Sequence, residues 1–271
     1  MRKGTEIFFP DFLIINSESR FLPHSGQLSA SQPRFRPGKN WRIALFDAIL
    51  PRDMKDAAGQ SSVANTPAAL AAGFRAVLRD GAPVWLRPVQ PGDRDRIAAG
   101  MAQLSPDSRY FRFFTAQSRL GDDYLQQLTH VDQQDQVAWI ALDPVVAGEP
   151  GVGIGRFARS AAEPQAAEFA LTVVDAWQQR GVGSLLFAAL YALAWARGVR
   201  EVRGMALPEN RNFIQWCARL GAEARFANGV YTLCLPIREP AAFTAANASA
   251  GQFKRALEQA VAGLQMSRRE M

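Results

Sequence analysis

The segment with the clearest chemical potential is a glycine-bearing turn, Gln178-Gln179-Arg180-Gly181-Val182-Gly183, between a predicted strand and a predicted helix. Glycine allows backbone turns that other residues avoid and lets the backbone approach a ligand closely. The N–H groups of the turn and of the first helical residues have no partners within the helix, and they lie at the positive end of its dipole. The pattern predicts an anion cradle that suits a diphosphate, with Arg180 adding charge. The alternative is a tight strand-to-helix turn without a ligand.

A second group with chemical potential is Glu168, on the strand that precedes this turn. Because Ala167 and Phe169 flank it, we expect its carboxylate to be partly desolvated, with a pKa raised toward neutrality. The alternative is an exposed strand glutamate, or an ion-pair partner of one of the arginines.

The elements before the turn predict a mixed α/β order. Two strands flank an Asp80-Gly81 turn, which is a strong hairpin signal. Apolar spacing or a capping start predicts helices in PGDRDRIAAGMAQLS, SPDSRYFRFF and DDYLQQLTHV. Three strands follow, in QVAWIALD, GVGIGRFARS and AAEFALTVVDA.

The elements after the turn are a helix ending at Gly198, a strand in VREVRGMAL, a helix ending at Gly221, and a strand pair around Asn228-Gly229. The segment FKRALEQAVAGLQM predicts a peripheral helix near the end of the chain.

The glycine turn matches the Gln/Arg-x-x-Gly-x-Gly/Ala signature of the GNAT acetyltransferase superfamily, and it fits neither the Walker A nor the GxGxxG spacing. The order of elements and the block LPENRNFIQWCARLGAE also resemble that superfamily. Within it, RDGAPVWLRPVQPGDRDRI, LSPDSRYFRFF, LTHVD and AEFALTV look like the bacterial protein-lysine acetyltransferase subgroup. The resemblance implies an α/β fold with a mixed, mostly antiparallel central sheet and helices on both faces.

The resemblance also implies direct transfer of an acetyl group from acetyl-CoA, a co-substrate, to an amine, with no acyl-enzyme and no metal. Glu168 matches the glutamate thought to act as base, and backbone N–H groups around Thr172 and Val173 match the usual oxyanion donors. Asn210 matches an asparagine that contacts coenzyme A, although a helix N-cap is equally good local chemistry. The residues expected to bind the cofactor are Leu171, Thr172, Val173, Gln178, Gln179, Arg180, Gly181, Val182, Gly183, Ser184 and Asn210.

The sequence departs from the family at Cys217, where many members carry a tyrosine that protonates the leaving thiolate. A thiol there is more often a small buried hydrophobe than an acid, so this step stays open. Arg109, Tyr110 and Arg112 lie on a predicted helix that could border the acceptor cleft, although packing in the core is simpler for Tyr110. Asp132 could orient an amine, but a capped loop explains it better.

Composition limits the other classes of function. The 271 residues carry a net charge of +6, with two cysteines and two histidines, which excludes a disulfide framework and disfavours a Cys/His metal site. A basic run with interleaved aromatics, as in nucleic-acid binding, is not found. Apolar runs are too short to span a bilayer, so we expect a cytoplasmic protein that binds neither membrane nor nucleic acid. The oligomeric state stays open.

We therefore predict three regions: a poorly ordered extension over 1–75, an acetyltransferase domain over 76–237, and a tail with a peripheral helix over 238–271. The predicted function is N-acetyltransfer from acetyl-CoA to a primary amine, possibly a protein lysine. The alternatives are a small-amine acetyltransferase, which the basic charge mildly disfavours, and a non-catalytic acyl-CoA sensor or interaction domain.

Overall fold

The computed structural model describes residues 73–114 and 121–269. The predicted extension over 1–75 therefore lies almost entirely outside the described residues. The elements in chain order are β1 (Phe74–Val77), β2 (Pro83–Pro88), η3 (Pro91–Asp93), α3 (Arg94–Ala102), α4 (Pro106–Phe113), α5 (Asp122–Thr129), β3 (Gln136–Leu142), β4 (Gly151–Arg159), β5 (Ala166–Val173), η4 (Asp175–Trp177), α6 (Val182–Ala196), β6 (Glu201–Ala206), α7 (Arg211–Arg219), β7 (Glu223–Ala227), β8 (Val230–Pro236), η5 (Pro240–Ala242) and α8 (Ala248–Arg269).

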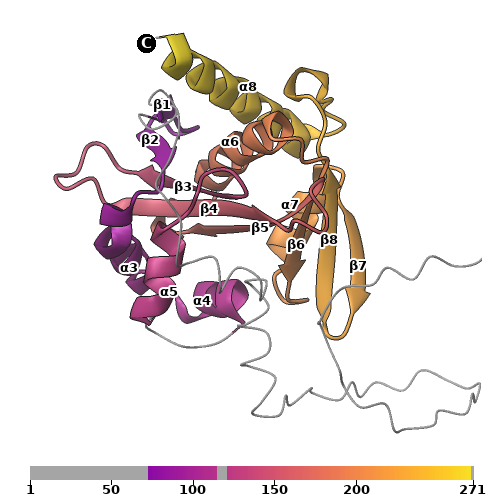
Figure 1. The fold of residues 1–271 in the computed structure, drawn as a ribbon, viewed down its shortest axis with the longest axis horizontal. Helices are drawn as coiled ribbons and strands as arrows, with labels where there is room; N and C mark the ends of the chain where they lie inside the picture. Colours follow the sequence, from indigo (N-terminus) through magenta and orange to yellow (C-terminus); the bar gives the residue numbers. More distant parts are fainter. Residues whose placement is uncertain (1–72, 115–120, 270–271) are drawn as a thin grey trace, which may run out of the picture. The chain divides into compact units, whose positions relative to one another are not determined.

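One eight-stranded sheet carries the fold, in the order β1-β2-β3-β4-β5-β6-β8-β7. Every neighbouring pair is antiparallel except β5 and β6, which run parallel. The parallel pair is connected through α6, because parallel strands need a crossover and a helix supplies it. The predicted mixed, mostly antiparallel sheet is confirmed (Figure 1).

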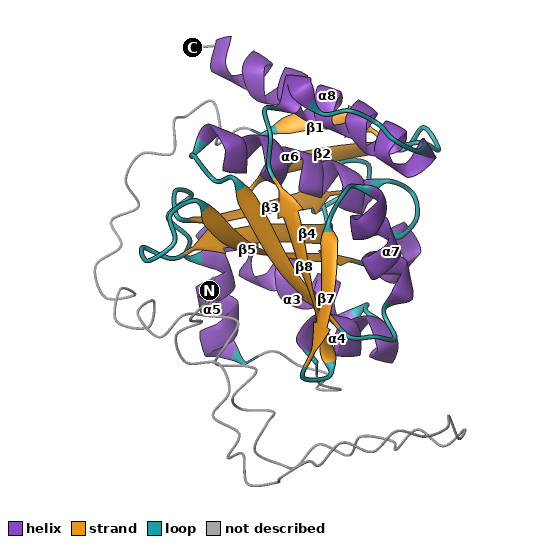
Figure 2. Cartoon of the chain, turned by 90° about the vertical axis from the view of Figure 1, so that its right-hand side faces the viewer, coloured by secondary structure: helices purple, strands orange, loops and turns teal. Residues whose placement is uncertain are grey.

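Helices cover both faces of the sheet, with α6 and α8 on one side and α3, α4 and α5 on the other (Figures 1 and 2). Adjacent residues of β4 show the alternation that separates the two faces. A Cβ atom at Gly153 would lie 3.0 Å from Leu186 of α6, on one face of the sheet. The next residue, Ile154, lies beside residues of α3 on the other face.

The C-terminal helix is longer than the predicted segment, and one of its faces is part of the core. Helix α8 begins at Ala248, before the predicted segment, and Phe253, Leu257 and Ala260 are almost fully buried. The ring of Phe253 packs against Phe187 of α6 at 5.5 Å between centroids. Because α6 is apolar nearly all round, it needs a second layer to cover its outer side, and α8 provides that layer.

None of the helices in 73–114 and 121–269 is long and apolar enough to cross a bilayer.

Two glycines of α8 give a matched test of this packing. A Cβ atom at Gly263 would lie 2.4 Å from the ring of Phe74 on β1, but at Gly251 the nearest atom would be 4.0 Å away. We expect Gly263→Ala to lower the free energy of unfolding by about 1–3 kcal/mol through overpacking. Gly251→Ala should be neutral or raise it by about 0.5–1 kcal/mol through helix propensity. Urea denaturation of both variants measures this, and equal effects would contradict the packing of α8 on β1.

Candidate active site

The glycine turn forms the start of α6, as predicted. Gln179 and Gly181 both adopt left-handed conformations, with φ of +58° and +113°, and Gly181 occupies the N-cap position of α6. A left-handed glutamine is strained, and such strain gathers at functional sites. The N–H groups of Val182, Gly183 and Ser184 have no partners within the helix. The turn therefore directs several N–H groups and the positive end of a 15-residue helix to one place.

Two arginines flank this turn, and one of them was not predicted. Arg180 lies 4.1 Å above the ring of Trp177 and pairs with Asp80 of the β1–β2 turn at 2.5 Å. The hydrogen bond from Arg180 lowers the pKa of Asp80. Arg79 donates to the carbonyl of Gln179, and its Nε lies 3.8 Å from the position that a Cβ atom of Gly181 would take. The turn of the first hairpin thus brings one more cation and one carboxylate to the anion cradle.

Strand β5 leads to the turn along a gap in the sheet. Its parallel pairing with β6 covers Ala166 to Glu168 only and ends at Glu168 and Arg203, although both strands continue. On the other side, β5 stays paired with β4 as far as Val173. The two strands therefore diverge beyond Glu168, and the divergence ends at the glycine turn.

The hydrogen-bond alternation identifies which groups of β5 face this gap. The N–H of Val174 donates to Val152 of β4, so the N–H of Thr172, two residues earlier, faces β4 as well. The N–H groups of Leu171 and Val173 then face β6, where the described strands offer them no partner. The carbonyl of Val173 also faces that way, since it accepts a bond from the side chain of Gln178 at 3.1 Å. Thr172 contributes its side chain rather than its N–H.

Asp175 holds the turn against α4. Its carboxylate accepts bonds from the N–H of Ser105 at 2.6 Å, the hydroxyl of Ser108 at 2.5 Å and the amide of Gln178 at 2.7 Å. Desolvation raises its pKa, but the bonds from Ser108 and Ser105 prevail and leave the pKa below the ordinary value. One ionised carboxylate thus fixes Gln178 and the start of α4 together.

Glu168 lies at the point where the strands part. Its side chain is exposed, and it lies on the sheet face opposite Ala167 and Phe169, which are buried toward α6. Desolvation raises its pKa, and Arg203 opposes the rise. Arg203 is engaged elsewhere, since it pairs with Glu201 and Glu163 at 2.6 Å each. The predicted pKa shift has the right direction, but its flanking residues are not the cause, because they point to the other face.

Asn210 occupies the N-cap position of α7, and its side chain makes no capping bond there. Phe213, one turn later, packs against Phe169 of β5 at 6.1 Å between ring centroids, which places this end of α7 beside β5. The side chain of Asn210 is therefore not used by the helix start, as a capping asparagine would be.

Cys217 is 2 % exposed, and burial raises the pKa of its thiol to about 12. It is part of the core, as the small-hydrophobe reading predicted. Asp132 caps its own loop by accepting from the N–H groups of Gln134 and Gln136 at 2.8 Å. Tyr110 is 38 % exposed, so it does not pack in the core as predicted.

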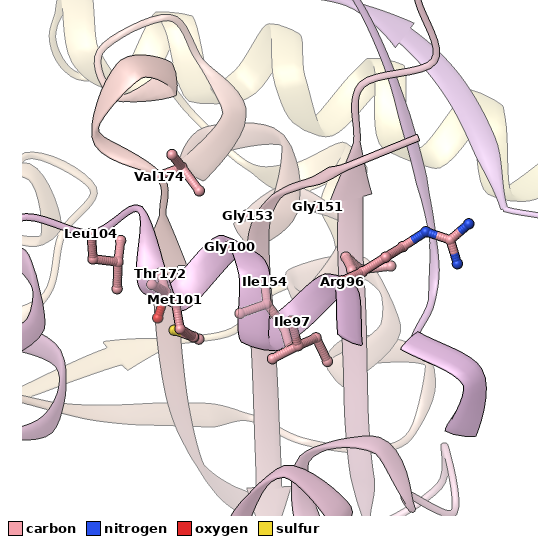
Figure 3. A pocket seen from close by; sticks show the side chains of 11 residues that line it. Arg96, Ile97, Gly100, Met101, Leu104, Gly151, Gly153, Ile154, Thr172 and Val174 are labelled. Atoms are coloured by element: carbon pink, nitrogen blue, oxygen red, sulfur yellow. The ribbon is translucent and has the colours of Figure 1, made fainter. Parts of the chain in front are cut away.

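A small apolar hollow lies beneath α3, lined by residues of α3 and strands β3, β4 and β5 (Figure 3). Its volume of about 20 Å³ is close to the space that one water molecule needs. It is too small for a substrate, and Thr172 is the residue of β5 that lines it.

Comparison with known proteins places these features in a family. Residues 84–223 match the family model described as "Acetyltransferase (GNAT) domain". The chain is 35% identical over 149 residues to "Acetyltransferase Pat" of Mycolicibacterium smegmatis, covering 54% of this chain and 43% of that relative. It is 33% identical over 144 residues to "Acetyltransferase PA5475" of Pseudomonas aeruginosa, covering 53% of this chain and 77% of that relative. The chain thus spans less than half the length of the first of these relatives.

Among solved structures, the GNAT domain of S. lividans PAT aligns with a TM-score of 0.58 and 30% identity. The alignment covers 64% of this chain and 99% of that domain. The family resemblance read from the glycine turn is confirmed.

The raised pKa of Glu168 predicts a pH-dependent effect of Glu168→Gln on stability. A carboxyl whose pKa is higher in the folded state favours folding while protonated, so its contribution is lost as pH rises through the folded pKa. We expect the variant to gain stability over the native protein above that pKa and to match it below the unfolded pKa. Thermal unfolding across pH 4 to 8 measures the difference. A difference that grows toward low pH would contradict the raised pKa.

Proposed function

The chain belongs to the family of GNAT acetyltransferases, and from this premise we propose that it transfers the acetyl group of acetyl-CoA to a primary amine. The observation that carries the proposal is the gap between β5 and β6, which ends at the glycine turn. A long, flexible substrate with a diphosphate at one end fits this arrangement, since the turn offers N–H groups for the diphosphate and the strand offers peptide groups for the arm.

We assign the diphosphate to the turn and to Arg180, and the pantetheine arm to the edge of β5. The cofactor-binding residues proposed from the sequence are retained in this role: Leu171, Val173, Gln178, Gln179, Arg180, Gly181, Val182, Gly183, Ser184 and Asn210, with Thr172 acting through its hydroxyl. The side chain of Asn210, which is not used as a cap, supports its contact with the arm. Arg79 is added because it lies over the turn.

The proposed reaction is direct. A neutral amine attacks the thioester carbonyl, and the N–H of Leu171 or Val173 stabilises the oxyanion that develops. Glu168 accepts the proton of the ammonium group before attack. Three residues of strand, about 10 Å, separate Glu168 from Leu171, so the proton travels through water, to which the exposed carboxylate has access.

The leaving thiolate receives its proton from solvent in this proposal. Cys217 stands where many relatives have a tyrosine, but it is buried in the core and its pKa is raised to about 12. A thiol so placed has no access to the gap and is too weak an acid to act at neutral pH. The coenzyme A thiolate is stable enough to leave without a dedicated acid.

A protein lysine is the acceptor class we propose first, because segments such as LSPDSRYFRFF and AEFALTV resemble the bacterial protein-lysine acetyltransferase subgroup. The net charge of +6 disfavours small polycations. The buried Cys217 keeps a second candidate, a non-catalytic acyl-CoA sensor, open to test.

Replacing Glu168 tests the catalytic role. We expect Glu168→Gln to bind acetyl-CoA normally and to lower kcat for transfer to lysine peptides by about 10²–10⁴, the usual contribution of a general base. The native kcat/KM should rise with pH through the raised pKa of Glu168, and the variant should lose this limb. Calorimetric titration and thiol release measure binding and transfer separately.

Glu223→Gln is the matched control, since Glu223 is an exposed strand glutamate on β7. This variant should leave both acetyl-CoA binding and kcat for transfer unchanged. A native protein that binds acetyl-CoA but releases no thiol with any amine would favour the sensor over the enzyme.

Replacing Asp80 tests the cradle. Asp80 neutralises Arg180 at 2.5 Å, so Asp80→Asn should free that charge for the diphosphate and tighten acetyl-CoA binding by up to about fivefold. The gain should shrink at high salt. Asp95→Asn, at an exposed position of α3, removes the same charge away from the turn and should change nothing. Weaker binding of Asp80→Asn would show that the ion pair holds Arg180 in its binding position.

A further inference from the structure

Three arginines gather on the sheet face that carries α4 and α5, and we call Arg109, Arg112 and Arg156 the arginine cluster. Arg156 of β4 is only 7 % exposed. In register beside it lie Ala138 of β3 and Ala170 of β5, which carry small side chains without charge.

Arg156 is a buried cation with little compensation. Within the described part of the chain, Arg156 donates a long hydrogen bond to the side-chain oxygen of Gln136, at 3.5 Å, and it forms no ion pair with a carboxylate. Desolvation lowers its pKa; Tyr124 counteracts this, and the charge of Arg112 adds to it. A buried charge without a partner costs several kcal/mol, so an anion would be strongly attracted to this place.

The two arginines of α4 extend this positive region toward solvent. Arg112 donates its Nε to the hydroxyl of Thr172 at 3.0 Å, and its guanidinium lies 5.0 Å from the ring of Phe113. Arg109 lies one turn earlier on the same helix, and its buried Nε has no hydrogen-bond partner among the described residues. The nearby carboxylate of Asp175 is already occupied by Ser105, Ser108 and Gln178, as described above.

Another buried arginine of the same sheet shows what full compensation looks like. Arg87 of β2 is 5 % exposed, and both of its terminal nitrogens bind the carboxylate of Asp93, at 2.6 and 2.7 Å. Asp93 is itself 1 % exposed. The fold thus supplies a carboxylate to Arg87 in the geometry that guanidinium prefers, and it supplies none to Arg156.

We propose that the arginine cluster binds a carboxylate of the substrate, so that the enzyme prefers a reactant that carries one. The cluster adjoins Thr172, which lies between Leu171 and Val173, so a carboxylate bound there is close to the proposed transfer site. This inference rests on the proposed function. The carboxylate comes either from the amine acceptor or from the far end of a dicarboxylic acyl chain, and both offer the same group to the guanidinium. The phosphates of coenzyme A are assigned to the glycine turn instead.

Matched pairs of reactants test the proposal. Succinyl-CoA is compared with propionyl-CoA, and malonyl-CoA with acetyl-CoA, because the first member of each pair carries an additional carboxylate. Nα-acetyl-lysine is compared with its carboxamide, which lacks the carboxylate, on protein saturated with coenzyme A. Calorimetric titration gives the binding constant in each case. We expect one of the two carboxylate-bearing classes to bind at least about tenfold more tightly, as for a charge-assisted hydrogen bond. The class that does so identifies the source of the carboxylate.

The variants Arg112→Gln and Arg156→Gln should lose this preference and still bind acetyl-CoA. Arg255→Gln, at an exposed position of α8, removes the same charge elsewhere and should keep it. Since Arg112 is only half-buried, its variant tests the proposal even where Arg156→Gln unfolds. Equal binding of both members in each pair, or a preference unchanged in both variants, would overturn the inference alone. Absence of binding by every acyl-CoA would overturn the proposed function as well.

Discussion

The short parallel contact between β5 and β6 is the constraint on which the rest of the site depends. Their pairing ends at Glu168 and Arg203, and beyond it each strand follows its other neighbour, β5 with β4 and β6 with β8. The strands can diverge without loss of the sheet because each keeps one complete set of backbone bonds. The divergence leaves peptide groups of Leu171 and Val173 available beside the glycine turn, which no continuous sheet would do.

The divergence must be held open by packing, and the helices do this. Phe169 contacts Phe187 of α6 and Phe213 of α7, so its ring lies between the two helices next to the gap. Helix α8 then covers α6 from outside through Phe253. The same apolar layer fixes the start of α6 and hence the direction of its first N–H groups. The apolar side chains that fill the core therefore also position the groups of the candidate site.

The sequence predicted those parts of the fold and site that depend on local pattern. The glycine turn, the order of strands and helices and the hairpin at Asp80-Gly81 follow from spacing and turn residues. The role of Glu168 as a base came from its match to the family and stays a prediction. The sequence did not predict Arg79 and Asp80 as neighbours of the turn, because they lie about a hundred residues away and only sheet pairing brings them there. The buried face of α8 was not predicted for a similar reason, because its burial depends on the apolar outer side of α6. Which N–H groups of β5 face β6 could not be predicted either, because that depends on the register between β4 and β5.

The electrostatics of Glu168 depend on what surrounds its nearest cation. Arg203 pairs with Glu168 in the register of the parallel strands, and its charge lowers the pKa of Glu168. Arg203 also binds Glu201 and Glu163, each at 2.6 Å, and the rise caused by desolvation of Glu168 exceeds the opposing effect of Arg203. On the same sheet face, none of the three arginines of the cluster forms an ion pair with a carboxylate of the described residues, and the nearby Asp175 accepts its hydrogen bonds from Ser105, Ser108 and Gln178. Arg203 is thus paired with carboxylates beside Glu168, which must keep its affinity for a proton. The arginine cluster is left without an ion pair where we expect a carboxylate of the substrate.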